Sequence, residues 1–190
     1  MFFSERKLMP FRVLIAFLIA LSPSCHAQDM FTTFSENVQA TWEHAMAGSS
    51  ELYVPAHIWH NGRDYTDEQI SHFNETPWGL GYGKGFRDEQ QNWHGFYVMA
   101  FQDSHRDIQP VAGYGHTWDF IGRSTQWDVG MGYTFLVTAR QDVYSYRLPV
   151  PFVLPLVSIG SGKVSIFGTY VPWVYGHGGV GFLFGKITLN

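Results

Sequence analysis

Strand-like segments follow one another from Glu51 to the end of the chain, and several of them are apolar on both faces. Residues 148–159 are almost continuously apolar, and residues 95–101 carry apolar or aromatic side chains on each face. A strand with two apolar faces contacts lipid or a core on one side and an apolar interior on the other. The eight segments are 52–61, 78–86, 92–102, 108–121, 125–138, 145–159, 163–170 and 180–189.

The composition agrees with a membrane protein made of strands. The chain is 17% aromatic and only 15% charged, which is unusual for a soluble globular protein. Its mean hydropathy is only −0.10, which excludes a bundle of membrane-spanning helices. Short turns alternate with longer loops, as they do at the two ends of an outer-membrane barrel. We therefore predict an all-β fold, an eight-stranded antiparallel transmembrane β-barrel over residues 51–190.

Residues 28–50 are expected to form a helix and a linker. Apolar side chains recur every four residues in this segment, at Met30, Phe34, Val38 and Trp42. This spacing predicts an amphipathic helix over residues 29–45. A helix that lies in the membrane interface and an ordinary surface helix packed on a core both fit this pattern.

Residues 1–27 resemble a signal peptide. Basic residues precede a short apolar run, and Cys25-His26-Ala27 resembles a cleavage site, so we expect export and cleavage before Gln28. The alternative is a retained anchor, but the apolar run is short for one. Cleavage would remove the only cysteine and leave a net acidic chain, so we expect no disulfide and no nucleic-acid partner.

Two features of the strands leave alternatives open. An apolar interior can be a solid core of side chains or a cavity for an apolar ligand. Prolines also fall in or beside the strand segments, where they cannot donate a ladder hydrogen bond. Either they lie beyond the hydrocarbon zone, or they mark weakly paired seams that admit lipid sideways. These residues are Pro55, Pro77, Pro149, Pro151, Pro155 and Pro172.

Candidate catalytic residues fall at the ends of the first and third segments. The histidines are scattered without a metal-ligand motif, and the chain has neither a phosphate-binding loop nor a Gly-x-Ser-x-Gly elbow. In an up-and-down barrel, His60 and the pair Asp103-Ser104 would share the outer rim. A base, a carboxylate and a hydroxyl are the groups that acyl transfer uses. Solvated loop residues would show the same pattern.

Across nearly the whole mature length, the chain resembles the outer-membrane lipid A palmitoyltransferases, the PagP-type family. The matching stretches are Thr32-Thr33-Phe34, Glu36-Asn37, Thr41-Trp42, Leu52-Tyr53-Val54-Pro55-Ala56, Trp59-His60, Asn74-Glu75, Pro77-Trp78-Gly79, Asn92-Trp93-His94-Gly95, Ala100-Phe101, Asp103-Ser104, Ala112-Gly113-Tyr114-Gly115, Val137-Thr138-Ala139-Arg140, Leu154-Pro155-Leu156, Thr169-Tyr170-Val171-Pro172 and Tyr175.

The resemblance implies a barrel with an N-terminal amphipathic helix in the Gram-negative outer membrane. It implies transfer of a palmitoyl group from the sn-1 position of a glycerophospholipid donor to a hydroxyacyl chain of a lipid A acceptor. The residues it implies are catalytic His60, Asp103 and Ser104, an acyl-chain ruler at Gly115, and lipid gating by Tyr175, Pro55, Pro77, Pro155 and Pro172.

Two other functions remain open from the residues alone. One is a barrel that binds lipid without catalysis, and the other is a phospholipase that uses water as the acceptor. In each case we expect a monomer surrounded by outer-membrane lipid, with no cofactor and no metal. Asp103 and Ser104 are adjacent, so in a regular strand their side chains would point apart. A turn at this point, or a mechanism unlike the serine relay, is needed to bring both to His60.

Overall fold

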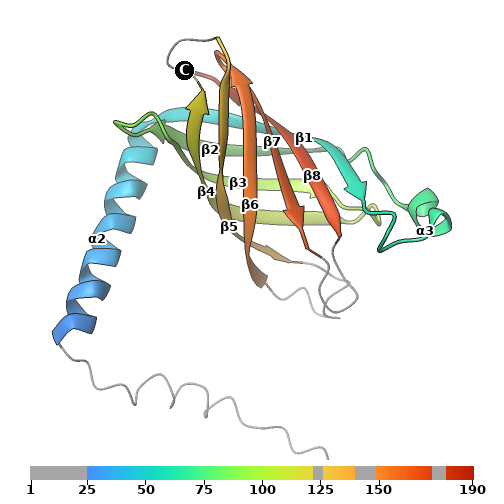
Figure 1. Cartoon of the computed structure of the whole chain (residues 1–190), viewed down its shortest axis with the longest axis horizontal. Helices are drawn as coiled ribbons and strands as arrows, with labels where there is room; N and C mark the ends of the chain where they lie inside the picture. The colour runs from blue at the N-terminus through green and yellow to red at the C-terminus, as the bar shows by residue number, and fades with distance from the viewer. Residues whose placement is uncertain (1–24, 122–125, 140–148, 173–178) are drawn as a thin grey trace, which may run out of the picture. The chain divides into compact units, whose positions relative to one another are not determined.

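The strands form one closed barrel in the computed structural model, which describes residues 25–121, 126–139, 149–172 and 179–190 (Figure 1). Each strand pairs antiparallel with its neighbours in the chain, and the last strand closes on the first. The prediction of an eight-stranded antiparallel barrel is therefore confirmed. The strands are β1 (Ser49–His60), β2 (Gly79–Arg87), β3 (Trp93–Gln102), β4 (Ile108–Ile121), β5 (Asp128–Ala139), β6 (Pro149–Ser161), β7 (Val164–Val171) and β8 (Val180–Thr188).

Several boundaries differ from those predicted. β1 begins at Ser49, so the connection after the first helix is shorter than the expected linker. β5 begins at Asp128 and β6 at Pro149, later than the sequence pattern indicates. The start predicted for the fifth segment and the first residues predicted for the sixth lie outside the described residues.

Within the described residues, two helices accompany the barrel. The predicted N-terminal helix is present as α2 (Cys25–Ala47), which extends beyond the expected range at both ends. The second, α3 (Asp67–His72), lies between β1 and β2 and was not predicted. Its start has a capping box, in which Thr66 and Gln69 satisfy each other's backbone amides. Among the described residues, no helix is long and apolar enough to cross a membrane.

The last turns of α2 pack on the outside of the barrel. The ring of Trp42 meets that of Phe96 edge-to-face, with 5.0 Å between centroids, and His44 lies 5.5 Å from Phe86. Ala45 is fully buried. This end of the helix is therefore held by side chains that point outward from β2 and β3.

β1 contains a bulge that changes which of its residues face the interior. Pro55 pairs with Phe184 of β8 and His57 pairs with Leu183, so Ala56 has no partner in that ladder. Before the bulge, Tyr53 and Pro55 are buried, and after it Ile58 and His60 are. An extra residue in one strand switches the faces of all residues that follow it. The bulge therefore turns His60 into the barrel.

The interior is partly a packed core and partly a cavity, which answers the question that the sequence left open. At mid-barrel, large buried side chains fill the lumen, among them Tyr53, Trp93, Leu156 and Phe167. Toward the end where β1 finishes, a cavity of about 280 Å³ remains. At the opposite end the interior is polar, with Glu51 and Lys186 both buried.

In two places, adjacent strands lose their hydrogen-bond pairing toward the end of the barrel that carries His60. The pairing of β1 with β2 ends at Tyr53 and Gly81, so the second half of β1 has no ladder with β2. The pairing of β6 with β7 begins only at Leu156 and Thr169, so the first half of β6 has no ladder with β7. The barrel thus has two weakly paired seams, as the prolines suggested.

Candidate active site

The predicted catalytic residues lie where two strands finish at the same end of the barrel. His60 is the last residue of β1, and Asp103 and Ser104 lie in the turn after β3. Because β1 and β3 run in the same direction around an antiparallel barrel, their ends meet at one rim. Asn74 N donates to Ser104 O over 2.8 Å, which fixes this turn against the segment before β2.

His60 and Ser104 are in direct contact. The imidazole Nε2 lies 2.9 Å from Ser104 Oγ, although the two residues are 44 positions apart. This is the distance at which a base can accept a proton from a hydroxyl group. His60 is only 3% exposed, so water has little access to the ring.

Asp103 is adjacent to Ser104 in the chain, but its carboxylate is hydrogen-bonded to backbone amides of the turn. Its Oδ1 accepts hydrogen bonds from the backbone amides of His105 at 2.8 Å and Asp107 at 2.9 Å. These bonds hold the turn in which Ser104 reaches His60, so the turn resolves the difficulty that adjacent residues point apart in a regular strand. The structure thus brings two of the three predicted residues together, and the third, Asp103, holds the turn that carries Ser104.

Glu75 is the carboxylate that faces the other side of the imidazole. Its Oε1 lies 3.5 Å from His60 Nδ1, at the long end of the hydrogen-bond range. The backbone of the same residue is fixed, because Ile58 N donates to Glu75 O over 2.9 Å. With Nδ1 donating to Glu75, Nε2 is free to accept the Ser104 proton. The sequence analysis did not predict this contact, although Asn74-Glu75 is one of the stretches that carry the family resemblance.

Aromatic rings from the first loop cover the imidazole. The ring of Phe73 lies 4.4 Å from that of His60 at 30°, and Tyr65 meets it edge-on at 5.4 Å. Phe73 also contacts Tyr65 and His105. These rings come from the residues on either side of α3, so the helix that the sequence did not predict positions the cover of the site.

The cavity opens below this group and runs into the barrel. Its rim carries His60, Asp103 and Ser104. Its far end is formed by Tyr97, Thr134, Leu154 and Phe184, of which Tyr97 and Phe184 belong to the packed core. Most of the lining between them is apolar, including Ile58, Met99, Phe101, Val111, Leu136, Phe152 and Phe182. A narrow apolar pocket with polar groups only at its mouth fits a hydrocarbon chain whose reactive end is at the rim.

Gly115 lies one layer below the cavity, beside Trp93. A Cβ atom added there would lie 2.8 Å from Trp93 Cζ3 and 3.3 Å from Leu156 Cδ2. The indole thus occupies space that a side chain at this position would need. A larger residue would have to displace Trp93 or Leu156 from the layer that supports the cavity.

Of the residues expected to gate lipid, the four prolines border the two seams. Pro55 flanks the bulge in β1 and Pro77 precedes β2, so both border the first seam. Pro155 lies where the pairing of β6 with β7 stops, and Pro172 follows β7, so both border the second. Tyr175 lies outside the described residues. Within the described ranges, no group of three or more His, Cys, Asp or Glu side chains is arranged to hold a metal ion.

Comparisons with known proteins bear on this site. Residues 37–186 match the model of the family described as "Antimicrobial peptide resistance and lipid A acylation protein PagP". The chain belongs to the PagP family. Because the match includes β1 to β7 and most of β8, the whole barrel and its rim are part of the PagP pattern.

Individual relatives of the PagP family agree over most of their length. The chain is 40% identical over 181 residues to the "Lipid A acyltransferase PagP" of Bordetella parapertussis, covering 93% of this chain and 96% of the relative. Proteins of the same name from Shigella boydii and Pantoea ananatis are 42% identical over 159 residues and 46% over 153. These matches cover 83% of each chain for the former, and 79% of this chain and 77% of the relative for the latter. PagP membership and the closed barrel make this an outer-membrane protein.

Proposed function

We propose that this protein moves a palmitoyl group from the sn-1 position of a glycerophospholipid to a hydroxyacyl chain of lipid A. One observation carries the proposal: His60 Nε2 lies 2.9 Å from Ser104 Oγ at the mouth of an apolar cavity. The donor's acyl chain occupies the cavity, and its ester lies at the rim beside the imidazole. The names of the relatives, lipid A acyltransferases, support lipid A as the acceptor.

His60 is the general base in this reaction. It takes a proton from the attacking hydroxyl, which is that of Ser104 if an acyl-enzyme forms, or that of lipid A if transfer is direct. The ester carbon forms a bond to this oxygen and loses its bond to the sn-1 oxygen of the donor. The leaving oxygen receives the proton from His60, and a lysophospholipid departs. If Ser104 has been acylated, the step repeats: the lipid A hydroxyl gives its proton to His60 and attacks the acyl carbon, and Ser104 Oγ leaves and takes that proton back. Glu75 holds the imidazole in the orientation that both proton transfers need.

The seams provide lateral access from the membrane. At each one, a run of β-strand lacks its ladder, on β1 in one case and on β6 in the other. Prolines border both runs, so no backbone amide is available at those positions to close the gap. Because the cavity opens at the same end, an acyl chain can pass from the bilayer into the lumen without leaving apolar surroundings.

The protein acts as a monomer after cleavage of its signal peptide.

The test is to incubate purified protein with phospholipid, with and without lipid A, and to weigh both lipids by mass spectrometry. We expect lipid A to gain one palmitoyl group and the donor to become its lysophospholipid. His60→Ala or Ser104→Ala should lower the rate by about 100-fold or more in a folded barrel. His57→Ala is the matched control, because this neighbouring histidine lies outside the interior and should leave the rate unchanged.

Other products would contradict the proposal. Free fatty acid with unmodified lipid A would indicate a phospholipase, in which water takes the place of the acceptor. Bound lipid without any product, unaffected by the His60 and Ser104 substitutions, would indicate a lipid-binding barrel.

A further inference from the structure

Glu51 and Lys186 form a buried ion pair inside the barrel, far from the rim residues. Glu51 Oε1 lies 2.6 Å from Lys186 Nζ, and the two residues are 2% and 5% exposed. A buried ion pair is weak grounds for assuming a gain in stability, because desolvation of both charges opposes their attraction. The proposed chemistry uses neither group, so the pair needs another explanation.

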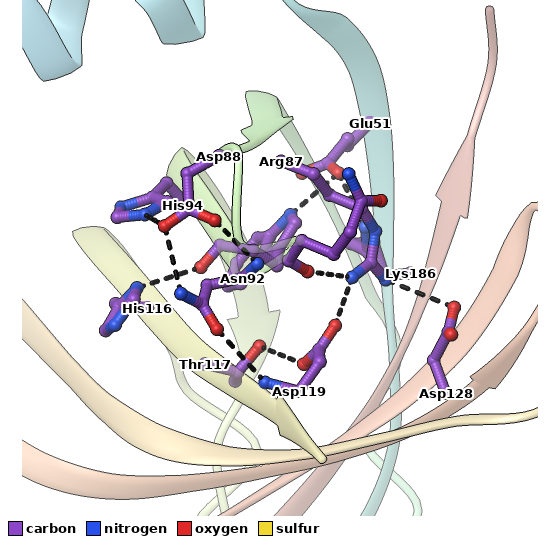
Figure 2. A network of polar contacts seen from close by, with 12 residues as sticks. Glu51, Arg87, Asp88, Asn92, His94, His116, Thr117, Asp119, Asp128 and Lys186 are labelled. Atoms are coloured by element: carbon purple, nitrogen blue, oxygen red, sulfur yellow. Dashed lines mark hydrogen bonds and ion pairs between the residues drawn. The ribbon is translucent and has the colours of Figure 1, made fainter. Parts of the chain in front are cut away.

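The Glu51 carboxylate also holds two aromatic side chains. Oε1 accepts a hydrogen bond from the indole Nε1 of Trp93 over 3.0 Å, and Oε2 accepts one from the Tyr53 hydroxyl over 2.6 Å. Both residues are almost completely buried, so each donor needs a partner inside the protein. Figure 2 shows Glu51 and Lys186 close together inside this end of the barrel, where they come from the paired strands β1 and β8.

These aromatic side chains support the far end of the cavity. Tyr53 packs against Tyr97 at 5.5 Å and against Phe184 at 6.1 Å, and both of these line the cavity. Trp93 packs against Phe167 at 4.9 Å, and Phe167 stacks on Phe184. Lys186 Nζ lies 5.1 Å from the centre of the Trp93 ring, so the cation faces the same indole that the carboxylate binds. The ion pair is therefore joined through one layer of aromatic side chains to the closed end of the cavity.

We propose that Glu51 is a positioning residue for acyl-chain length. It holds Trp93 and Tyr53 at a fixed depth, and Lys186 neutralises its charge so that the carboxylate can remain buried. The depth of the cavity, and with it the length of chain that places its ester at His60, depends on these two hydrogen bonds. This inference rests on the proposed acyl transfer.

The experiment compares two double variants that both remove the buried charges. Glu51→Gln with Lys186→Met keeps an oxygen that accepts from the Trp93 indole and an amide nitrogen that can donate to the Tyr53 hydroxyl oxygen, whereas Glu51→Leu with Lys186→Met removes both partners. Because neither variant leaves an unpaired charge, they differ in the hydrogen bonds alone. Each is given phospholipids with 14-, 16- or 18-carbon chains at sn-1 in equal amounts, together with lipid A, and the transferred chains are weighed by mass spectrometry.

We expect the Gln variant to keep the wild-type preference among the three chains. In the Leu variant, the ratio of the preferred chain to the other two should fall by about tenfold or more, because one methylene in an apolar pocket is worth at least that factor. Asp128→Asn is the control at the same end, because Asp128 pairs with Arg87 at 3.2 Å and should leave the preference unchanged (Figure 2).

Folding is checked separately by heat-modifiable migration on gels and by near-ultraviolet circular dichroism of the aromatic residues. A folded Leu variant with the wild-type chain preference would overturn the inference. A Gln variant that loses the preference as fully as the Leu variant would do so too, because charge would then be the cause. Absence of transfer by the wild-type protein would instead contradict the proposed function.

Discussion

Tyr53 and His60 face the same interior because the unpaired residue Ala56 forms a bulge between them. Tyr53 and His60 both point into the barrel although they are separated by an odd number of positions, which is impossible in a regular strand. The bulge between Pro55 and His57 accounts for the odd spacing, because Ala56 is an extra residue without a partner in β8. Bulges commonly redirect a side chain beside a functional site, and here the side chain is the proposed general base.

Deleting Ala56 should remove the bulge and still leave His60 inside the barrel. Pro55 and His57 already pair with the consecutive residues Phe184 and Leu183, so the deletion gives a regular strand in which His60 keeps its partner Val180. Transfer to lipid A, measured by mass spectrometry, should therefore be retained, whereas loss of the general base in His60→Ala lowers it by about 100-fold or more. Loss of transfer in a folded deletion variant would mean that the bulge does more than set the face of His60.

Glu75 should matter through its hydrogen bond to His60. We expect Glu75→Ala to lower the transfer rate about tenfold or more, because the imidazole loses the group that orients it. Glu75→Gln keeps an acceptor oxygen and should have a smaller effect. Rates of transfer measured at saturating lipid separate the chemical step from binding. Equal rates for Glu75→Ala and the wild type would assign the orienting role elsewhere.

Enlarging Gly115 should shorten the acyl chain that the protein transfers. In Gly115→Met, the new side chain would meet Trp93 and Leu156 in the layer below the cavity and push that layer toward the rim. Mass spectra should show a shift from 16-carbon to shorter donors. Gly181→Ala is a control, since a Cβ atom there meets only Trp59, at 3.4 Å. An unchanged donor length in Gly115→Met would refute a ruler at this position.

Stability at acid pH should depend on the turn between β2 and β3. Burial acts to raise the pKa of Asp88, but hydrogen bonds from Asn92 and His94 outweigh it and hold that pKa below its ordinary value. The carboxylate therefore stabilises the fold at pH values above its unfolded pKa, near 4, and this contribution disappears as pH falls through the lower folded pKa.

Urea unfolding in detergent can measure this effect in wild type and Asp88→Asn. At neutral pH the variant should be less stable by about 1.5–3 kcal/mol, the usual range for hydrogen bonds to a charged group. The difference should shrink as the pH falls below 4. A difference that is constant from pH 7 to pH 3 would show that the charge of Asp88 is not involved.

Sequence periodicity predicted most of the barrel because each strand must present alternate residues to lipid and to the interior. The number of strands, their order and the apolar lumen all follow from that requirement. The bulge could not be predicted in this way, because both faces of β1 are rich in apolar residues and the switch at Ala56 leaves no break in the pattern. α3 is short, and its capping signal at Thr66 lies in a loop that has no apolar face.

The catalytic geometry was predictable only in part. The ends of β1 and β3 had to meet, which brought His60 and Ser104 to one rim. The contact between His60 and Glu75 depends on the path of a loop that folds back over the site, and a strand pattern says nothing about that path. Whether the lumen was hollow depended on ring orientation, above all on the Trp93 indole, which fills the space beside Gly115.

A cavity that is closed at its inner end imposes an order on the reaction. The packed rings above Glu51 leave the acyl chain no passage through the barrel, so it must withdraw by the side from which it came. While one acyl chain occupies the cavity, no other acyl chain can enter it. The same acyl chain therefore stays in the cavity from donor binding until lipid A has received it, and only withdrawal of the finished product empties the cavity for the next cycle.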